Sequence, residues 1–365
     1  MYHNPVKVVE TDSWQEKCKE VQESLGIHEP LVVTSPGNLR RQKLPTVFNP
    51  NSIFSNIAPN PTFESCQDAI NFSKRVVFDG LIAIGGGSVM DTAKTILAAS
   101  GTGKDTIEHV LRFTDSFPKR VPSIFVPTTH GTGSEVTMWG TIWNVKEKKK
   151  YSLSHPNLYP DVAILDGSLT LSLPLDISIS TLLDALSHSF EAIWNKNRNP
   201  KSTYFAIQAI CLILENVEKL KHDLKNREVR SKLLKAANIA GLAFSNTKTA
   251  AAHSISYPLT TNFQVPHGIA SSLAILPLLE INQSEIEGEL GQLLEQLNMK
   301  GLSELSSRIK EIPSNAIKFT LQDWGVQKNQ LEELVTQSFA KGRMDNNIVE
   351  LTEEHVGWIL NEIYS

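Results

Sequence analysis

The sequence predicts an α/β domain with a mostly parallel sheet, followed by an all-helical domain. Three observations support this. Short apolar runs alternate with helical patterns in the first half, two of these runs enter glycine-rich turns, and long helical patterns dominate after about residue 172. A chain of 365 residues is also longer than one compact core usually holds. We therefore expect an α/β domain over residues 1–172 and a helical domain over residues 173–365.

Four short apolar runs, each bounded by turn or polar residues, predict the strands: 30–35, 81–84, 123–126 and 161–165. Helical patterns lie between them at 63–77 and 90–99. In the second half, helical patterns cover 177–194, 201–220, 227–244 and 269–279. The leucine-rich segment 169–176, which Pro174 interrupts, is expected to connect the two domains.

Composition narrows the class of protein. Hydrophobic residues make up 41% of the chain, charged residues 20%, and the formal net charge is -4, so nothing favours nucleic-acid or membrane-surface binding. Cys18, Cys66 and Cys211 are scattered, which indicates neither a disulfide framework nor a thiolate zinc site. The N-terminus lacks an apolar signal core, and no apolar run approaches the ~18 residues of a membrane span. We expect a cytoplasmic protein.

Two glycine-rich turns follow predicted strands. GGGSVMDTAK (85–94) opens a helix, with Ser88 expected at the N-cap and Asp91 three residues later. PTTHGTGSEVT (127–137) surrounds two glycines with hydroxyl groups. Backbone N–H groups at such turns bind phosphate, and both turns should meet at the carboxyl edge of the sheet, although each alone could be a plain strand-to-helix turn. The candidate cofactor-binding residues are Gly86, Gly87, Ser88, Asp91, Thr128, Thr129, Thr132 and Ser134.

A second constellation suggests a metal. Asp184 and His188 are four residues apart in a helical pattern, so both side chains lie on one face. His253 lies in a later helical pattern and His267 follows Pro266. One carboxylate and three imidazoles suit Fe(II) or Zn(II), which can polarise a carbonyl group. Spacing alone leaves two alternatives to a metal site. Asp184 and His188 could form an ion pair or hydrogen bond within the helix, and His267 could be a loop residue.

These segments resemble the iron-containing, or group III, alcohol dehydrogenases. The resemblance rests on 85–94, 127–137, DALSHSFEA (184–192), the segment from His253 to VPHGIA, and PNPTFES (59–65), in order between about residues 30 and 280. It implies a dinucleotide-binding α/β domain, a helical metal domain, an active site in the cleft between them and a possible homodimer. It also implies NADPH or NADH as cofactor, an aldehyde or alcohol as substrate, and Asp184, His188, His253 and His267 as metal ligands.

The resemblance also addresses the cofactor. The charged run 146–151 is interpreted as an exposed hairpin or loop. The resemblance implies that a lysine near this run contacts the cofactor, and Lys150 is the candidate. NAD-preferring members carry an acidic residue where this chain has Ser35, and Arg40 and Arg41 follow. Because a missing carboxylate removes repulsion toward a 2′-phosphate, we expect NADPH to be preferred over NADH.

Two positions depart from the family pattern. Many members have a histidine, implicated in proton relay, where this chain has Tyr257, and a small residue where it has His130. A phenol can donate a hydrogen bond to a substrate oxygen but is a poor base at neutral pH. Proton delivery is therefore expected through Tyr257, a neighbouring threonine, the cofactor ribose or water. We interpret His130 as a loop residue near the cofactor.

The segment 246–260 resembles a narrower branch, the phosphonoacetaldehyde reductases. If it is one helix, Asn246, Thr249, His253 and Tyr257 share a stripe. Lys248 beside it, or less directly Arg198, could bind a phosphonate. The expected reaction converts phosphonoacetaldehyde to 2-hydroxyethylphosphonate, as part of phosphonate metabolism. Alternatives are a general iron-dependent alcohol dehydrogenase, a maleylacetate reductase-like enzyme, a lyase of the dehydroquinate synthase type and a non-catalytic nucleotide-binding protein.

Overall fold

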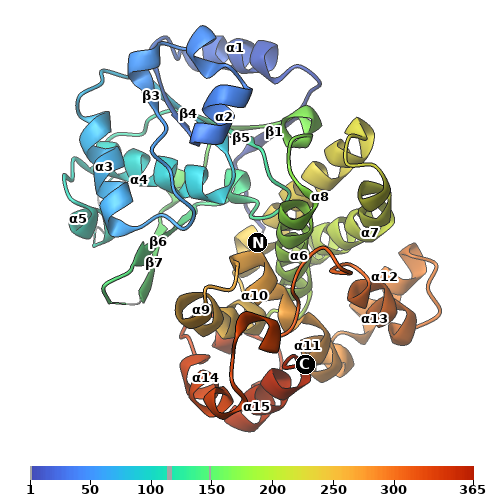
Figure 1. Ribbon diagram of the computed structural model, residues 1–365. Helices are drawn as coiled ribbons and strands as arrows, with labels where there is room; N and C mark the ends of the chain where they lie inside the picture. Colours follow the sequence, from blue (N-terminus) through green and yellow to red (C-terminus); the bar gives the residue numbers. More distant parts are fainter. Residues whose placement is uncertain (1, 113–116, 148) are drawn as a thin grey trace. The chain divides into compact units, whose positions relative to one another are not determined.

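The computed structural model describes residues 2–112, 117–147 and 149–365. By its internal contacts the chain divides into two compact units, shown in Figure 1. The sheet unit comprises residues 4–129 and 134–170, and the helical unit comprises residues 1–3, 130–133 and 171–365. The predicted fold class, a parallel α/β domain followed by a helical domain, is confirmed.

The sheet unit is built on a six-stranded, fully parallel sheet with the order β1-β8-β5-β4-β2-β3. The four predicted runs form its central strands β2 (Pro30–Thr34), β4 (Gly80–Gly85), β5 (Ser123–Pro127) and β8 (Val162–Leu165). The strands at the two edges, β1 (Lys7–Glu10) and β3 (Ile53–Phe54), were not predicted. They are short and only partly buried, so they lack a continuous apolar run.

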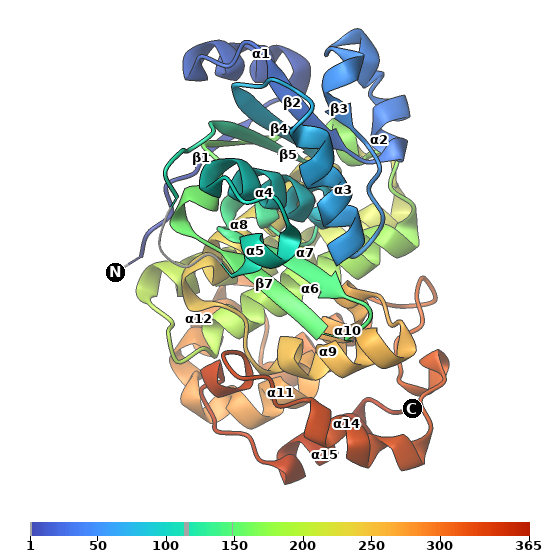
Figure 2. The ribbon, with the colours of Figure 1, turned by 90° about the vertical axis from the view of Figure 1, so that its left-hand side faces the viewer.

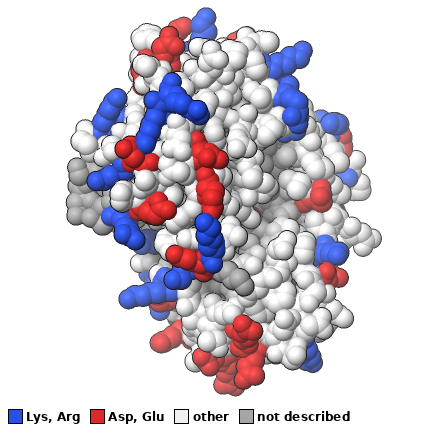
Figure 3. Space-filling view, turned by 60° about the vertical axis from the view of Figure 1, so that its left-hand side comes forward, with Lys and Arg blue, Asp and Glu red and all other residues white. Residues whose placement is uncertain are grey.

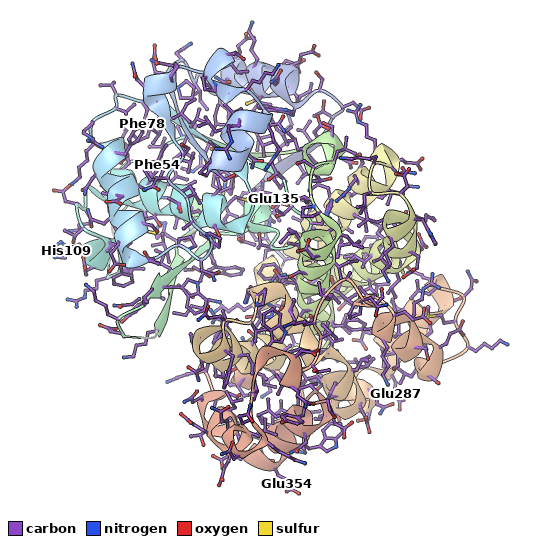
Figure 4. All side chains as sticks on the ribbon, viewed as in Figure 1. Phe54, Phe78, His109, Glu135, Glu287 and Glu354 are labelled. Atoms are coloured by element: carbon purple, nitrogen blue, oxygen red, sulfur yellow. The ribbon has the colours of Figure 1, made fainter. Side chains whose placement is uncertain are left out.

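Alternation along the central strands fills two cores. Ile82 and Ile84 point to the face covered by α1 (Trp14–Leu25), while Leu81 and Ala83 point to the face covered by α3 (Phe63–Ser73) and α4 (Gly87–Thr102), which Figure 2 shows in front of the sheet. Phe54 packs its ring 5.3 Å from that of Phe72 in the second core (Figure 4). Burial on both faces explains why these strands read as continuous apolar runs.

The sheet unit is completed by shorter elements. These are α2 (Pro36–Arg41), α5 (Ile107–Leu111) and an antiparallel hairpin of β6 (Trp139–Asn144) and β7 (Lys149–Ser154). The hairpin contains the lysine-rich run, as expected, apart from Lys148, which lies outside the described residues.

The helical unit centres on three long helices that pack against one another, α6 (Leu175–Ile193), α7 (Pro200–His222) and α8 (Arg227–Thr247). The remaining helices are α9 (Ala251–Phe263), α10 (His267–Leu273), α11 (Ile275–Asn282), α12 (Glu287–Gln296), α13 (Leu302–Lys310), α14 (Leu331–Gln337) and α15 (Glu353–Glu362). The predicted single helix over 269–279 is wrong, because the chain leaves helical geometry at Ala274, whose ψ is 2°. Among the described residues no strand follows Leu165.

The segment 246–260 is also not one helix. Helix α8 ends at Thr247, Lys248 adopts a left-handed φ of 67°, and α9 begins at Ala251. Two asparagine side chains stabilise the backbone between α8 and α9. Asn195 Nδ2 donates to the Lys248 carbonyl at 3.1 Å, and Asn346 Nδ2 donates to the Thr249 carbonyl at 2.8 Å. The expected stripe of Asn246 and Thr249 with His253 therefore does not form.

Charged side chains of both signs alternate over the face shown in Figure 3, with a group of acidic residues at its lower end. Such mixing agrees with the small net charge of -4. Within the described ranges, no helix is both long and apolar enough to cross a lipid bilayer.

Candidate metal centre and nucleotide-binding loops

Four side chains of the helical unit converge around one point. Asp184 and His188 come from α6 and His253 from α9, and the candidate ligand atoms of these three residues lie within 4.8 Å of one another. All three side chains are buried. The His188 ring stacks on that of His253 with centroids 4.5 Å apart. The helical spacing thus does place the aspartate and histidine on one inward face.

His267 lies beside this cluster as the first residue of α10. Its Nε2 is 3.9 Å from Asp184 Oδ1, and its side chain is 26% exposed, more than that of the other three. Gly268 makes the approach possible, because a Cβ there would lie 2.2 Å from the Ser180 carbonyl oxygen of α6. The glycine after His267 therefore has a structural reason, the close contact of α10 with α6.

The electrostatics of the cluster favour a cation. Burial alone would raise the pKa of the Asp184 carboxyl, but the imidazoles of His188, His253 and His267 hold that pKa well below its usual range. Burial likewise opposes a charged His253, yet the carboxylates of Glu191 and Asp184 raise the pKa of His253 to about 9. Positive charge is thus stabilised at the point where these groups meet.

The Nε2 atom of His253 faces the carboxylate of Asp184 within the cluster. His253 Nε2 is buried, has no hydrogen-bond partner among the described residues, and lies 3.6 Å from Asp184 Oδ1. That separation is too long for a hydrogen bond but suits two ligands of one ion. The donor set of one carboxylate and imidazole nitrogens therefore fits divalent iron or zinc.

Two residues that the sequence analysis did not single out support the cluster. Glu191, fully buried on α6, lies with its Oε2 2.5 Å from His253 Nδ1 and accepts from the His253 backbone N–H through Oε1 at 3.0 Å. Ser271 Oγ donates to Asp184 Oδ1 at 3.0 Å. Such contacts fix the orientation of a ligand and the tautomer of an imidazole. The signal in the sequence was the position of Glu191, three residues after His188 and seven after Asp184, on the same helix face as the predicted ligands.

Tyr257 lies one helical turn after His253 on α9 and is half-buried. Its Oη accepts a hydrogen bond from Arg343 Nε at 3.0 Å. Arg343 lies beyond the segments used in the sequence analysis and was not predicted. The phenol therefore has a guanidinium partner within the helical unit.

The other candidate substrate residues have different surroundings. The Asn246 amide exchanges two hydrogen bonds with the backbone of His3, and the Lys248 side chain is exposed. Thr249 contributes its carbonyl to Asn346. Arg198 Nε donates to Glu289 Oε1 at 3.0 Å in an ion pair, so its charge is already balanced.

The two glycine-rich turns follow the adjacent strands β4 and β5, and the Thr128 N–H donates to the Gly85 carbonyl at 3.0 Å. Gly86, not Ser88, is the N-cap of α4, so that expectation is wrong; Ser88 Oγ instead accepts from the Asn60 N–H at 3.2 Å. A Cβ on Gly86 would lie 3.0 Å from Thr129 Cγ2, which shows how closely the second turn approaches the helix start. Backbone N–H groups at this N-terminus suit a phosphate.

Asp91 and Ser134, expected at the cofactor, are bonded to the protein itself. Asp91 accepts from Ser134 Oγ and from the Thr141 N–H, both at 3.0 Å. Lys94, buried on α4, donates through Nζ to Ser134 Oγ and the Ser134 carbonyl at 2.8 Å and to the Trp139 carbonyl at 2.6 Å. Burial lowers the pKa of Lys94 to about 8, although Asp91 and Glu135 (labelled in Figure 4) oppose the shift. These residues join α4 to the second turn.

The remaining cofactor candidates lie at the ends of nearby elements. Ser35 follows β2 and caps α2, where its Oγ accepts from the Asn38 N–H at 3.3 Å. The buried Asn38 donates to Thr128 Oγ1 at 3.1 Å, which ties α2 to the second turn. Lys150 on β7 lies with Nζ 5.6 Å from the centre of the Trp143 ring. Thr132 belongs to residues 130–133 of the helical unit.

Comparison with known proteins decides the family. The model of the iron-containing alcohol dehydrogenases matches residues 5–167, and that of the C-terminal domain of the Fe-containing alcohol dehydrogenase family matches residues 178–364. The chain belongs to the iron-containing alcohol dehydrogenase family. It is thus an oxidoreductase, and iron and NAD are cofactors found in this family.

Individual relatives of this iron-containing dehydrogenase differ in their substrates. It is 29% identical to long-chain-alcohol dehydrogenase 1 of Geobacillus thermodenitrificans over 339 residues, 88% of this chain and 85% of that protein. It is 33% identical to the phosphonoacetaldehyde reductase of Streptomyces viridochromogenes over 217 residues, 58% of this chain and 55% of that protein. The solved sulfoacetaldehyde reductase from Bifidobacterium kashiwanohense, in complex with NAD+, superposes with a TM-score of 0.92 at 28% identity, covering 100% of this chain and 98% of that one.

Proposed function

We propose that this protein is a metal-dependent, NAD(P)H-linked reductase that converts phosphonoacetaldehyde to 2-hydroxyethylphosphonate. The observation that carries the reaction type is the buried cluster of Asp184, His188 and His253, with His253 Nε2 lacking a hydrogen-bond partner among the described residues. Two relatives support the substrate class, because their names specify aldehydes with a phosphonate or a sulfonate group. Both groups are tetrahedral anions.

In this proposal Asp184, His188, His253 and His267 hold the metal. A divalent iron or zinc ion bound there would supply Lewis acidity toward the aldehyde oxygen. With a metal bound, Glu191 would hold the proton of His253 on Nδ1 and leave the lone pair of Nε2 for the ion. Tyr257 is the candidate proton donor, since its hydroxyl oxygen accepts from Arg343 while a phenol also carries an O–H that can be donated.

The proposed cofactor contacts lie in the sheet unit and in residues 130–133. Backbone groups of Gly86 and Gly87, with Ser88, are proposed to bind phosphate. The hydroxyls of Thr128, Thr129 and Thr132 and the charge of Lys150 would add contacts to the cofactor. Asp91 and Ser134 shape the turn through their mutual hydrogen bond. Ser35 in place of an acidic residue supports a preference for NADPH over NADH.

Initial rates over a panel of aldehydes test the proposal. The purified protein, reconstituted with Fe(II) or Zn(II) and supplied with NADPH, is assayed with phosphonoacetaldehyde, a carboxylate-bearing aldehyde and a neutral aldehyde. We expect kcat/KM to be highest for phosphonoacetaldehyde and turnover to disappear on chelation of the metal. Highest activity on neutral aldehydes would instead identify a general alcohol dehydrogenase, and on carboxylates a maleylacetate reductase-like enzyme. Absence of any cofactor oxidation would indicate a nucleotide-binding protein without this activity.

A further inference from the structure

We propose that Ser271 is a positioning residue, whose hydroxyl orients the carboxylate of Asp184 for metal binding. This rests on the proposed function, because it concerns the same metal centre. The observation behind it is the 3.0 Å hydrogen bond from Ser271 Oγ to Asp184 Oδ1. Both side chains are buried, so bulk solvent does not compete for this contact, and a hydrogen bond in such surroundings is stronger than in water.

The oxygen that Ser271 contacts is the one nearest the imidazoles of the cluster. Asp184 Oδ1 lies 3.6 Å from His253 Nε2 and 3.9 Å from His267 Nε2. A free carboxylate can turn about its Cβ–Cγ bond and exchange its two oxygens, because this torsion is broad and roughly two-fold. A hydrogen bond to one of the oxygens restricts that rotation. Ser271 therefore holds Oδ1 on the side of the two histidines.

Helix α10 fixes the hydroxyl of Ser271 through contacts with α6. The backbone carbonyl of Ser271 accepts from Ser187 Oγ of α6 at 2.8 Å. Gly268 allows the two helices to approach, since a Cβ there would lie 3.2 Å from Asp184 Cβ. Ser271 also lies four residues after His267, about one turn along α10, so the two side chains share a face of the helix. The docking of α10 thus brings a proposed ligand and a hydrogen-bond donor to the cluster together.

The hydroxyl of Ser271 has one proton to donate and two acceptors within reach. Its Oγ lies 3.0 Å from Asp184 Oδ1 and 3.3 Å from the Gly268 carbonyl oxygen of its own helix. Because a hydrogen bond to an ionised acceptor is shorter and stronger than one to a neutral acceptor, the proton goes to the carboxylate. Donors that hold a ligating carboxylate in this way support the affinity of a site for its metal.

The neighbouring Ser272 provides a matched comparison. It is buried on the same helix, and its Oγ lies 2.8 Å from the Gly268 carbonyl oxygen and 2.9 Å from that of Ile269. Both acceptors belong to α10, so this hydroxyl serves its own helix. The two serines therefore separate the loss of a buried hydroxyl from the loss of a bond to Asp184.

The test compares Ser271→Ala with Ser272→Ala. The purified wild type and both variants, freed of metal, are titrated with Zn(II) and with Co(II), whose visible absorption reports the geometry of the ligands. We expect Ser271→Ala to weaken binding of both ions about tenfold to a hundredfold and to alter the Co(II) spectrum. Ser272→Ala should keep the affinity and the spectrum of the wild type. Denaturation of the metal-free proteins shows whether the two variants are equally stable.

Ser187→Ala separates the hydroxyl of Ser271 from the packing of α10, since it removes a bond between α6 and α10 and leaves that hydroxyl in place. Its affinity for Zn(II) should fall less than that of Ser271→Ala. Equal losses in Ser271→Ala and in either control variant would overturn the positioning role. If the wild type binds one ion per chain and Ser271→Ala binds it equally well with an unchanged Co(II) spectrum, this inference fails and the proposed metal centre stands. If the wild type binds neither ion, the proposed metal centre fails as well.

Discussion

The carboxylate of Glu191 lies 2.5 Å from Nδ1 of His253, and its other oxygen accepts the backbone N–H of the same histidine at 3.0 Å. Glu191 is fully buried, so its charge is compensated chiefly by this imidazole. The pair directs His253 Nε2 toward Asp184 Oδ1, 3.6 Å away. A glutamate outside the predicted ligand set thus determines the orientation of one of its members.

Glu191→Gln tests this relationship. The substitution keeps the shape of the side chain but removes the charge that favours a proton on His253 Nδ1. We expect the affinity for the metal to fall about tenfold to a hundredfold, as for other carboxylates that support a ligating histidine. Titration of the metal-free protein with Zn(II) or Co(II) measures the change. An unaltered affinity would show that Glu191 serves the fold alone.

His267→Ala tests the fourth proposed ligand. Because the side chain of His267 is 26% exposed and lies at the start of α10, its removal should disturb the core little. We expect loss of bound metal and of turnover with the far-ultraviolet circular dichroism unchanged, since the three remaining side chains would hold the ion less tightly. A variant that is metal-free yet fully active would rule out this metal site.

Lys94→Met should destabilise the sheet unit by about 3 kcal/mol, because it leaves buried acceptors of Ser134 and Trp139 unpaired. Chemical denaturation followed by tryptophan fluorescence measures the loss. Lys104→Met, at an exposed position, is the control and should stay within about 0.5 kcal/mol of the wild type. Equal stabilities of the two variants would contradict a structural role for Lys94.

His130 should lower the free energy of unfolding of the protein as the pH falls. It is fully buried, both ring nitrogens lack hydrogen-bond partners among the described residues, and burial lowers its pKa to about 3. In the unfolded chain this histidine takes up a proton below its ordinary pKa of 6.5, while the folded chain does not. The stabilising contribution is therefore present above pH 6.5 and is lost progressively as the pH falls from there toward 3.

His130→Ala removes this dependence. Between pH 7 and pH 5 we expect the free energy of unfolding of the variant to fall by about 2 kcal/mol less than that of the wild type. Denaturation curves at pH 7 and pH 5 give the free energy of unfolding at each pH. The cavity left by the substitution lowers both values equally, so it does not affect the difference between them. His28→Ala, at an exposed position, should retain the wild-type dependence. Identical slopes for His130→Ala and the wild type would exclude the buried imidazole as the cause.

The parts of the fold that were predicted are those with a strong local pattern. The central strands are buried on both faces and read as apolar runs, whereas the edge strands β1 and β3 are short and only partly buried. The break at Lys248 was missed because nothing in its residue type requires a left-handed φ. It depends on Asn195 and Asn346, which are distant in sequence.

The site also combines residues that a local sequence pattern identifies with residues that only tertiary contacts identify. Asp184 and His188 could be placed together from helical spacing, because four residues make about one turn. Glu191 lies within a recognised motif, but its function depends on where α9 places His253. Arg343 has no local signal, since its partner Tyr257 lies on a helix much earlier in the chain. Contacts of this kind follow from tertiary packing and not from residue spacing.

Ser35→Asp tests the proposed preference for NADPH. Ser35 Oγ caps α2 by accepting from the Asn38 N–H, and aspartate caps helices equally well, so the variant should fold normally. The added carboxylate would repel a 2′-phosphate and accept from a ribose hydroxyl. We expect the ratio of kcat/KM with NADPH to that with NADH to exceed one in the wild type and to fall about tenfold or more in Ser35→Asp. Ser35→Asn keeps both the cap and the shape without the charge, and should leave the ratio close to that of the wild type. If Ser35→Asn and Ser35→Asp shift the ratio equally, the charge at this position is not what selects the cofactor.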